Sequence, residues 1–278
     1  MTTQPIPESL GLIAGKGAYP RLLAASAKKQ GVRRVFAVAF RGETDSVIQK
    51  CADEVVWLRF GQLEALLEAF RTSGVRQAVM AGQITPTHLF TMRLDRRALS
   101  LLTKLRERNA ETIFGAIADE LRTVGVELLP ASLFMESAMP EAGVLSARPP
   151  TDREKADIEI GLSVAKMTSG LDIGQTVVIK EGTILAVEAF EGTDAAIARA
   201  GKLGGPGAVI VKVAKRGHDM RFDIPVVGEH TLRSLRKIKA SALAVEAHRT
   251  ILLEREKIIA EANRLNLCLV SVDVERAR

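Results

Sequence analysis

The chain has few aromatic residues, two cysteines and no long hydrophobic run. Aromatic residues make up 4% of 278 residues, with one Trp and one Tyr, so it offers few stacking platforms and we expect no nucleic-acid partner. Cys51 and Cys268 lie far apart and form no Cys-x-x-Cys pair, which excludes a disulfide framework and a zinc ribbon. Because a membrane span needs about 18 apolar residues and no signal sequence begins the chain, we expect a cytoplasmic protein.

The charge balance is slightly basic. Lys and Arg number 39 against 33 Asp and Glu, a net charge of +6 with a pI of about 9.5. This modest excess suits an anionic partner, such as a phosphate ester or an acidic lipid surface. Hydrophobic residues at 47% and charged residues at 26% are typical of a globular protein. The length favours two domains over one.

The first half of the chain alternates strands and helices. Apolar runs of strand length are followed by segments whose apolar residues recur at helical spacing. This order predicts a Rossmann-like domain, a parallel sheet with helices on both faces. The expected strands are 10–14, 35–40, 55–58, 78–81 and 127–129, and the expected helices are 19–30, 63–72, 93–108 and 109–124.

The periodicity is lost across residues 140–150, where a Pro-Pro pair cannot continue a helix and favours an extended spacer. We therefore expect an N-terminal, nucleotide-side domain over 1–139, a linker over 140–150, and a C-terminal domain over 151–278 that carries the acidic catalytic residues. Thr151 and Glu154 form a capping-box signature for the next helix.

The second half favours a mixed α/β domain, because its strands come partly in pairs. A Glu-Gly-Thr turn between the first two strands looks like a hairpin. The expected strands are 176–180, 184–190, 208–213, 222–227, 242–247 and 267–272, and the expected helices are 193–202, 231–238 and 252–265.

Two strands of the first half end in similar glycine turns. Ligands of open parallel sheets bind at the carboxyl ends of strands, and backbone N–H groups at a glycine turn before a helix attract an anion. The alternative is that the glycines only make tight turns. The residues predicted to bind substrate here are Ala14, Gly15, Lys16, Gly17, Gly82 and Gln83.

Neither nucleotide motif is complete at the first turn. Gly17 stands where a Walker loop needs Ser or Thr. Pro20 replaces the third glycine of a dinucleotide fingerprint, and Arg41 follows the second strand where an NAD site has an acid. An NADP-linked oxidoreductase that uses Arg41 remains an alternative.

Charged residues gather at the end of one strand in the second half. Glu188, Glu191, Gly192 and Thr193 connect a strand to a helix. Lys212 lies inside an apolar strand, where a lysine is unfavourable unless an anion pairs with it. These residues predict a second anion-binding region.

Three further charged residues alternate along the chain. Asp219, Arg221 and Asp223 would lie on one side of an extended segment. Acids can hold Mg²⁺ or orient water, and cations can neutralise phosphate oxygens, which is most of what phosphoanhydride hydrolysis requires. Alternatives are a structural salt-bridge network and a non-catalytic module that binds lipid or nucleotide.

Several blocks resemble one family, the LpxI-type UDP-2,3-diacylglucosamine pyrophosphatases. They are residues 11–20, 174–178, 186–194, 211–212 and 221–228, and the resemblance covers nearly the whole chain. It implies a two-domain α/β enzyme of lipid A biosynthesis that hydrolyses the pyrophosphate of UDP-2,3-diacylglucosamine to UMP and 2,3-diacylglucosamine 1-phosphate (lipid X), with Mg²⁺. His218 departs from the family pattern, in which glutamine precedes Asp219.

The motifs and the resemblance together give a predicted site. Asp223, Asp219 and Arg221 are expected to be catalytic, and Asp223, Asp219 and Glu188 to hold Mg²⁺. Since the substrate is a membrane lipid, we expect the enzyme to lie at the acidic inner-membrane surface as a peripheral protein. Beside the two glycine turns, the residues predicted to bind substrate are Glu191, Gly192, Thr193 and Lys212.

Overall fold

The computed structural model describes residues 6–83, 93–107, 109–215, 217, 219–222 and 224–274. By their contacts the residues form two compact units, the first made of Met1–Met135 and Asp219–Asp223, the second of Glu136–His218 and Ile224–Arg278. The first holds a parallel sheet and the second a mixed sheet, so the predicted α/β class is confirmed. No helix in the described ranges is both long and apolar enough to cross a bilayer.

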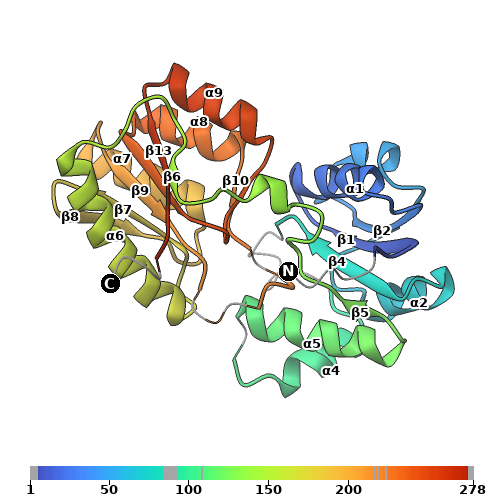
Figure 1. Ribbon diagram of the computed structural model, residues 1–278. Helices are drawn as coiled ribbons and strands as arrows, with labels where there is room; N and C mark the ends of the chain where they lie inside the picture. Colours follow the sequence, from blue (N-terminus) through green and yellow to red (C-terminus); the bar gives the residue numbers. More distant parts are fainter. Residues whose placement is uncertain are drawn as a thin grey trace. The chain divides into compact units, whose positions relative to one another are not determined.

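The first unit is a five-stranded parallel sheet in the order β3-β2-β1-β4-β5. Helix α1 covers one face, and α2, α4 and α5 cover the other (Figure 1). Because the strand order reverses between β1 and β4, the carboxyl ends of these two strands lie at a topological switch point. The elements are β1 (Ser9–Ala14), α1 (Tyr19–Lys29), β2 (Arg34–Phe40), η1 (Ser46–Lys50), β3 (Glu54–Leu58), α2 (Leu63–Ser73), β4 (Gln77–Ala81), α4 (Arg96–Lys104), α5 (Ala110–Thr123) and β5 (Glu127–Leu128).

The second unit is a six-stranded sheet in the order β6-β13-β11-β9-β7-β8, with a separate pair β10-β12. Helix α6 packs on one face, and α7, α8 and α9 pack on the other. Strands β9, β11 and β13 are parallel, and β7 and β8 form the predicted hairpin. The elements are η2 (Glu136–Ala138), β6 (Gly143–Val144), α6 (Asp152–Gly170), β7 (Thr176–Lys180), β8 (Thr183–Val187), α7 (Thr193–Gly204), β9 (Val209–Lys212), β10 (Val226–Val227), α8 (Glu229–Ile238), β11 (Ala242–Glu246), β12 (Ile251–Leu252), α9 (Arg255–Arg264) and β13 (Cys268–Val272).

The strand expected over 222–227 is wrong for most of its length, because only β10 is a strand. The chain before it turns, with Phe222 N–H donating to the Asp219 carbonyl at 3.3 Å. Phe222 is 2% exposed and belongs to the core of the first unit, where its ring lies 5.9 Å from that of Phe114. The described residues Asp219–Phe222 therefore group with the first unit, although they lie within the range 151–278 expected for the C-terminal domain.

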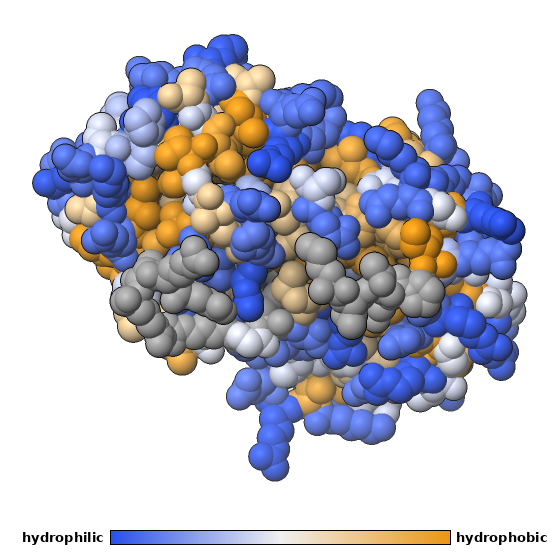
Figure 2. Space-filling view, viewed as in Figure 1, coloured by the Kyte–Doolittle hydropathy of each residue, from blue (hydrophilic) through white to orange (hydrophobic). Residues whose placement is uncertain are grey.

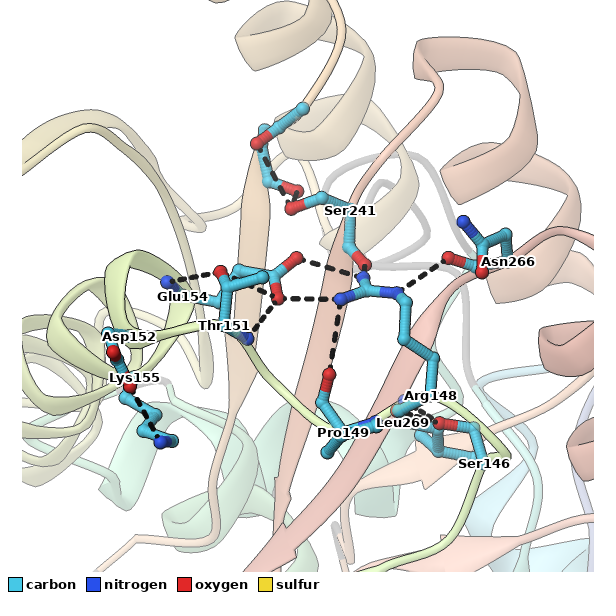
Figure 3. A network of polar contacts seen from close by, with 12 residues as sticks. Ser146, Arg148, Pro149, Thr151, Asp152, Glu154, Lys155, Ser241, Asn266 and Leu269 are labelled. Carbon is cyan, nitrogen blue, oxygen red and sulfur yellow. Dashed lines mark hydrogen bonds and ion pairs between the residues drawn. The ribbon is translucent and has the colours of Figure 1, made fainter.

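The expected spacer over 140–150 is held in place at several points. Gly143 and Val144 pair with β13, and the predicted capping box of Thr151 and Glu154 is present at the start of α6. Arg148 donates to both carboxylate oxygens of Glu154, at 2.8 and 2.9 Å, and to the Asn266 carbonyl at 3.1 Å (Figure 3). This network joins the start of α6 to the turn before β13.

The Arg148–Glu154 pair makes the stability of the fold depend on pH. Burial raises the pKa of Glu154, but the bonds from Arg148 and from the Thr151 N–H outweigh it and bring that pKa down to about 2, from an ordinary 4.5. A lowered pKa in the folded state stabilises the protein above the unfolded-state value, and this stabilisation is lost as the pH falls from 4.5 toward 2. We expect Glu154 to contribute about 3 kcal/mol near neutral pH, measured by urea unfolding from pH 6 to pH 3.

Glu154→Gln removes the titrating carboxylate and tests this prediction. It should lower the free energy of unfolding most at pH 6 and progressively less toward pH 3. Glu159→Gln, on the exposed side of the same helix, should keep the wild-type pH dependence. An unchanged slope in Glu154→Gln would show that this carboxylate does not cause the acid sensitivity.

Candidate functional site

The two predicted glycine turns lie against each other at the carboxyl ends of β1 and β4. Gly15 N–H donates to the Ala81 carbonyl at 2.8 Å, and Lys16 and Gln83 exchange backbone hydrogen bonds at 2.7 and 3.1 Å. Residues from two strands that are about 65 positions apart in the sequence thus form one polar edge at the switch point of the sheet.

Close backbone packing explains two of these glycines. A Cβ on Gly15 would lie 2.5 Å from the Gln83 carbonyl oxygen, and a Cβ on Gly82 would lie 2.8 Å from both the Gly15 carbonyl carbon and the Lys16 carbonyl oxygen. Gly15 and Gly82 therefore allow the two turns to pack backbone against backbone. Gly17 has a φ of +92° with open space around it, and α1 begins two residues later without a side-chain cap. The start of α1 and the side chain of Lys16 are thus the parts of this turn that can attract an anion.

In the second unit, three predicted residues form a chain of hydrogen bonds. Lys212 Nζ donates to Thr193 Oγ1 at 2.8 Å, and Thr193 Oγ1 donates to Glu188 Oε1 at 2.8 Å. Thr193 is the first residue of α7, and Lys212 is the last of β9. With only 7% of its surface exposed, Lys212 is a buried cation. The Thr193 hydroxyl group links it to the Glu188 carboxylate.

Glu191, predicted to bind substrate, is engaged differently. Its Oε1 accepts from Arg199 at 2.7 Å, and this bond lowers the pKa of the Glu191 carboxyl. Gly192, with a φ of +81°, precedes α7 as its N-cap. In this arrangement Glu191 fixes the first turns of α7, while Gly192 lets the chain turn into the helix.

A buried ion pair in the second unit was missed by the sequence analysis. Lys166 Nζ lies 2.7 and 2.6 Å from the two carboxylate oxygens of Glu246, and each side chain is 6% exposed. The pair also binds both backbone groups of Ala214, since Lys166 donates to its carbonyl at 2.7 Å and its N–H donates to Glu246 at 2.8 Å. The sequence did contain a signal for this pair, because Glu246 is a charged residue in the otherwise apolar strand Ala242–Glu246. The same kind of signal pointed to Lys212.

The predicted catalytic segment is described only in part. Asp219 accepts from Arg221 through both oxygens, at distances from 2.6 to 3.0 Å, and this bond raises the pKa of the Arg221 guanidinium. The two side chains thus face each other across a turn, not along an extended strand. Asp223 and His218 lie outside the described residues.

The described residues contain no group of three or more His, Cys, Asp or Glu placed to hold a metal ion. Glu188 Oε2 is buried and has no hydrogen-bond partner among the residues that the structure describes, so it is a carboxylate oxygen of the kind that Mg²⁺ prefers. Asp219 is less suited, because both of its oxygens are bound by Arg221.

Comparison with known proteins agrees with the resemblance seen in the sequence. The family models for the LpxI N-terminal domain and the LpxI C-terminal domain match residues 9–138 and 141–270. A curated protein of Caulobacter vibrioides, named UDP-2,3-diacylglucosamine pyrophosphatase LpxI, is 31% identical over 278 residues, which covers 95% of this chain and 97% of that protein. The chain belongs to the LpxI family.

Proposed function

We propose that this protein hydrolyses the pyrophosphate bond of UDP-2,3-diacylglucosamine, releasing UMP and 2,3-diacylglucosamine 1-phosphate for lipid A biosynthesis. The name of the Caulobacter relative supports this reaction, and the similarity extends over nearly the full length of both chains. The observation that carries the proposal is Lys212, a buried lysine at a strand end whose hydrogen bond goes to a hydroxyl group. Such a cation suits a phosphate oxygen.

The reaction needs position and charge more than covalent chemistry. Water attacks one phosphorus atom and loses a proton to solvent, the bridging P–O bond breaks, and the leaving phosphate carries away the bonding electrons. One of the three N–H groups of Lys212 donates to Thr193, and the other two can donate to phosphate oxygens. Asp219 holds the Nε and Nη2 groups of Arg221, which fixes the orientation of this guanidinium.

We further propose Mg²⁺ as the cofactor. Glu188 Oε2 fits an oxygen-binding cation, and Asp223 is the other candidate ligand predicted from the sequence. Bound Mg²⁺ would neutralise charge on the phosphate oxygens. Asp219, predicted as a third ligand, serves in this arrangement to orient Arg221.

Peripheral association with an acidic inner-membrane surface is part of the same proposal. The net charge is +6, and apolar surface lies in patches among hydrophilic side chains on the face drawn in Figure 2. Large apolar side chains stand exposed at the end of α6 and after β8, among them Met167, Leu171, Ile173 and Phe190. Basic and apolar surface together favour contact with anionic lipid.

The test is turnover of the lipid nucleotide by the purified protein, with UMP and the lipid product measured by mass spectrometry. We expect UMP release with Mg²⁺, loss of release with a chelator, and recovery when Mg²⁺ is restored. Asp223→Ala should lower the rate by about 10²-fold or more. Absence of UMP release by the wild-type protein would overturn the proposed reaction, and release that persists with the chelator would overturn only the cofactor.

A further inference from the structure

An open pocket in the first unit lies at the carboxyl ends of β2 and β3 and has no role in the reaction described above. Its volume is about 370 Å³, and it is lined by Arg41, Gly42, Thr44, Ser46, Gln49 and Trp57. Arg41 directly follows β2, Trp57 belongs to β3, and Ser46 and Gln49 belong to η1. The pocket volume is within the range typical of small-molecule sites.

Backbone hydrogen bonds hold the base of this pocket in place. Thr44 Oγ1 accepts from Phe40 N–H at 2.9 Å and donates to the Ala14 carbonyl, and Arg41 N–H donates to the Leu58 carbonyl at 2.8 Å. Ala14 is the last residue of β1 and directly precedes the glycine turn. The base of the pocket is therefore fixed, and it is bonded to the strand that leads into the turn at Lys16.

The polar side chains around the pocket are not engaged with the protein. Within the described chain, the side chains of Arg41, Ser46 and Gln49 make no hydrogen bond or ion pair, and the indole Nε1 of Trp57 is buried without a partner. Other cations of the same sheet are paired, such as Arg34 with Glu54 at 2.9 Å. A guanidinium, a hydroxyl and an amide that face one pocket beside an indole are thus available to a ligand.

These groups fit a nucleoside phosphate better than a lipid or a simple anion. An indole offers a flat apolar surface to a base, and a carboxamide can donate to a ring carbonyl and accept from a ring N–H. A guanidinium suits phosphate or ribose oxygens. Because β3 lies two strand spacings from β1, roughly 10 Å, one nucleotide can reach from this pocket to the Lys16 turn.

We propose that this pocket binds the uridine part of the substrate and of the product UMP, with the base against Trp57 and Gln49 and with Arg41 toward the ribose and phosphate. The proposal rests on the proposed function for the identity of the nucleotide. It gives a role to Arg41, which stands where an NAD-binding sheet has an acid, and it places the specificity for the nucleoside in the first unit.

The experiment uses the full-length protein and its intrinsic fluorescence, because Trp57 is the single Trp of the chain. UMP should change the Trp57 emission saturably, and calorimetry should give the same dissociation constant. Inorganic phosphate and glucosamine 1-phosphate, at the same concentrations, should leave the emission unchanged. Equal responses to inorganic phosphate and UMP would overturn the assignment to a nucleoside.

Arg41→Ala and Gln49→Ala should each weaken UMP binding by about tenfold or more and raise KM for the lipid nucleotide more than they lower kcat. The matched control is Arg33→Ala, at the opposite end of β2, where the Arg33 side chain is 80% exposed. Its dissociation constant should equal that of the wild type. Wild-type UMP binding in both pocket variants would overturn the proposal.

The two proposals can fail separately. Turnover of the lipid nucleotide together with no binding of UMP, by either fluorescence or calorimetry, would overturn the pocket and leave the reaction standing. Arg41-dependent binding of UMP by a protein that releases no UMP from the lipid nucleotide would overturn the reaction and leave the pocket standing.

Discussion

Replacing Lys212 with Met is expected to lower kcat for UMP release by about 10²–10³-fold, with the fold retained. Lys212 is the cation whose Nζ lies 2.8 Å from Thr193 Oγ1 at the start of α7, so its loss removes the positive charge that the proposed function assigns to neutralising phosphate oxygens. Methionine has similar length and suits a site that is 7% exposed. Thr193 keeps its bond to Glu188 at 2.8 Å, so the variant should unfold at a urea concentration close to that of the wild type.

The rate is measured at saturating substrate and Mg²⁺, so that the comparison reports kcat. Lys202→Met is the matched control, because Lys202 lies on the exposed side of α7 in the same unit. Its rate should equal that of the wild type. Full activity in a folded Lys212→Met protein would remove this lysine from the mechanism and leave its burial without a catalytic explanation.

Lys166→Met is expected to destabilise the fold by up to about 3–5 kcal/mol, the usual cost of breaking a buried pair, reduced by the remaining contact of Arg249, whose Nε lies 3.7 Å from Glu246 Oε1. The Glu246 carboxylate would lose both of its contacts to Nζ, at 2.6 and 2.7 Å, in a site where its side chain is 6% exposed. The Ala214 carbonyl would lose its donor as well. Urea unfolding at neutral pH measures the change.

A second variant separates the charge effect from lost packing. Lys166→Met combined with Glu246→Gln removes both charges and keeps an acceptor for the Ala214 N–H, so it should recover much of the lost stability. Lys155→Met, which breaks a surface pair with Asp152 on the same helix, should have little effect. A combined variant no more stable than Lys166→Met alone would show that the uncompensated charge is not the cause.

The ion pair also bears on the position of Lys212. Ala214, held through both backbone groups by Lys166 and Glu246, lies two residues beyond Lys212 on the chain that leaves β9. Since Val213 N–H also bonds to the Gln175 carbonyl at 3.0 Å, the end of β9 is fixed on two sides. In the combined variant the Ala214 N–H and the Val213 N–H can keep their bonds. We therefore expect the end of β9, and with it Lys212, to stay in place.

Much of the fold could be predicted, because hydrophobic periodicity and capping residues are features of short stretches of sequence. The apolar runs and helical spacings of the first half correctly gave a parallel sheet, and the capping box at Thr151 marked the start of α6. The strand expected over 222–227 failed because the Asp219 side chain bonds to the Arg221 N–H at 3.0 Å, and such local bonds favour a turn over a strand. Alternation of charges alone could not reveal this competition.

By itself, the sequence determined the α/β class, the family and the cluster of Glu188, Thr193 and Lys212, because a lysine in an apolar strand and acids at a strand end are visible in the residue order. Only the tertiary structure decided which groups these side chains bind. It paired Lys166 with Glu246 and Lys212 with Thr193, and it brought Arg41 and Trp57 to one pocket. The physical reason is that partners distant in sequence are chosen by strand order and packing, which a local pattern does not contain.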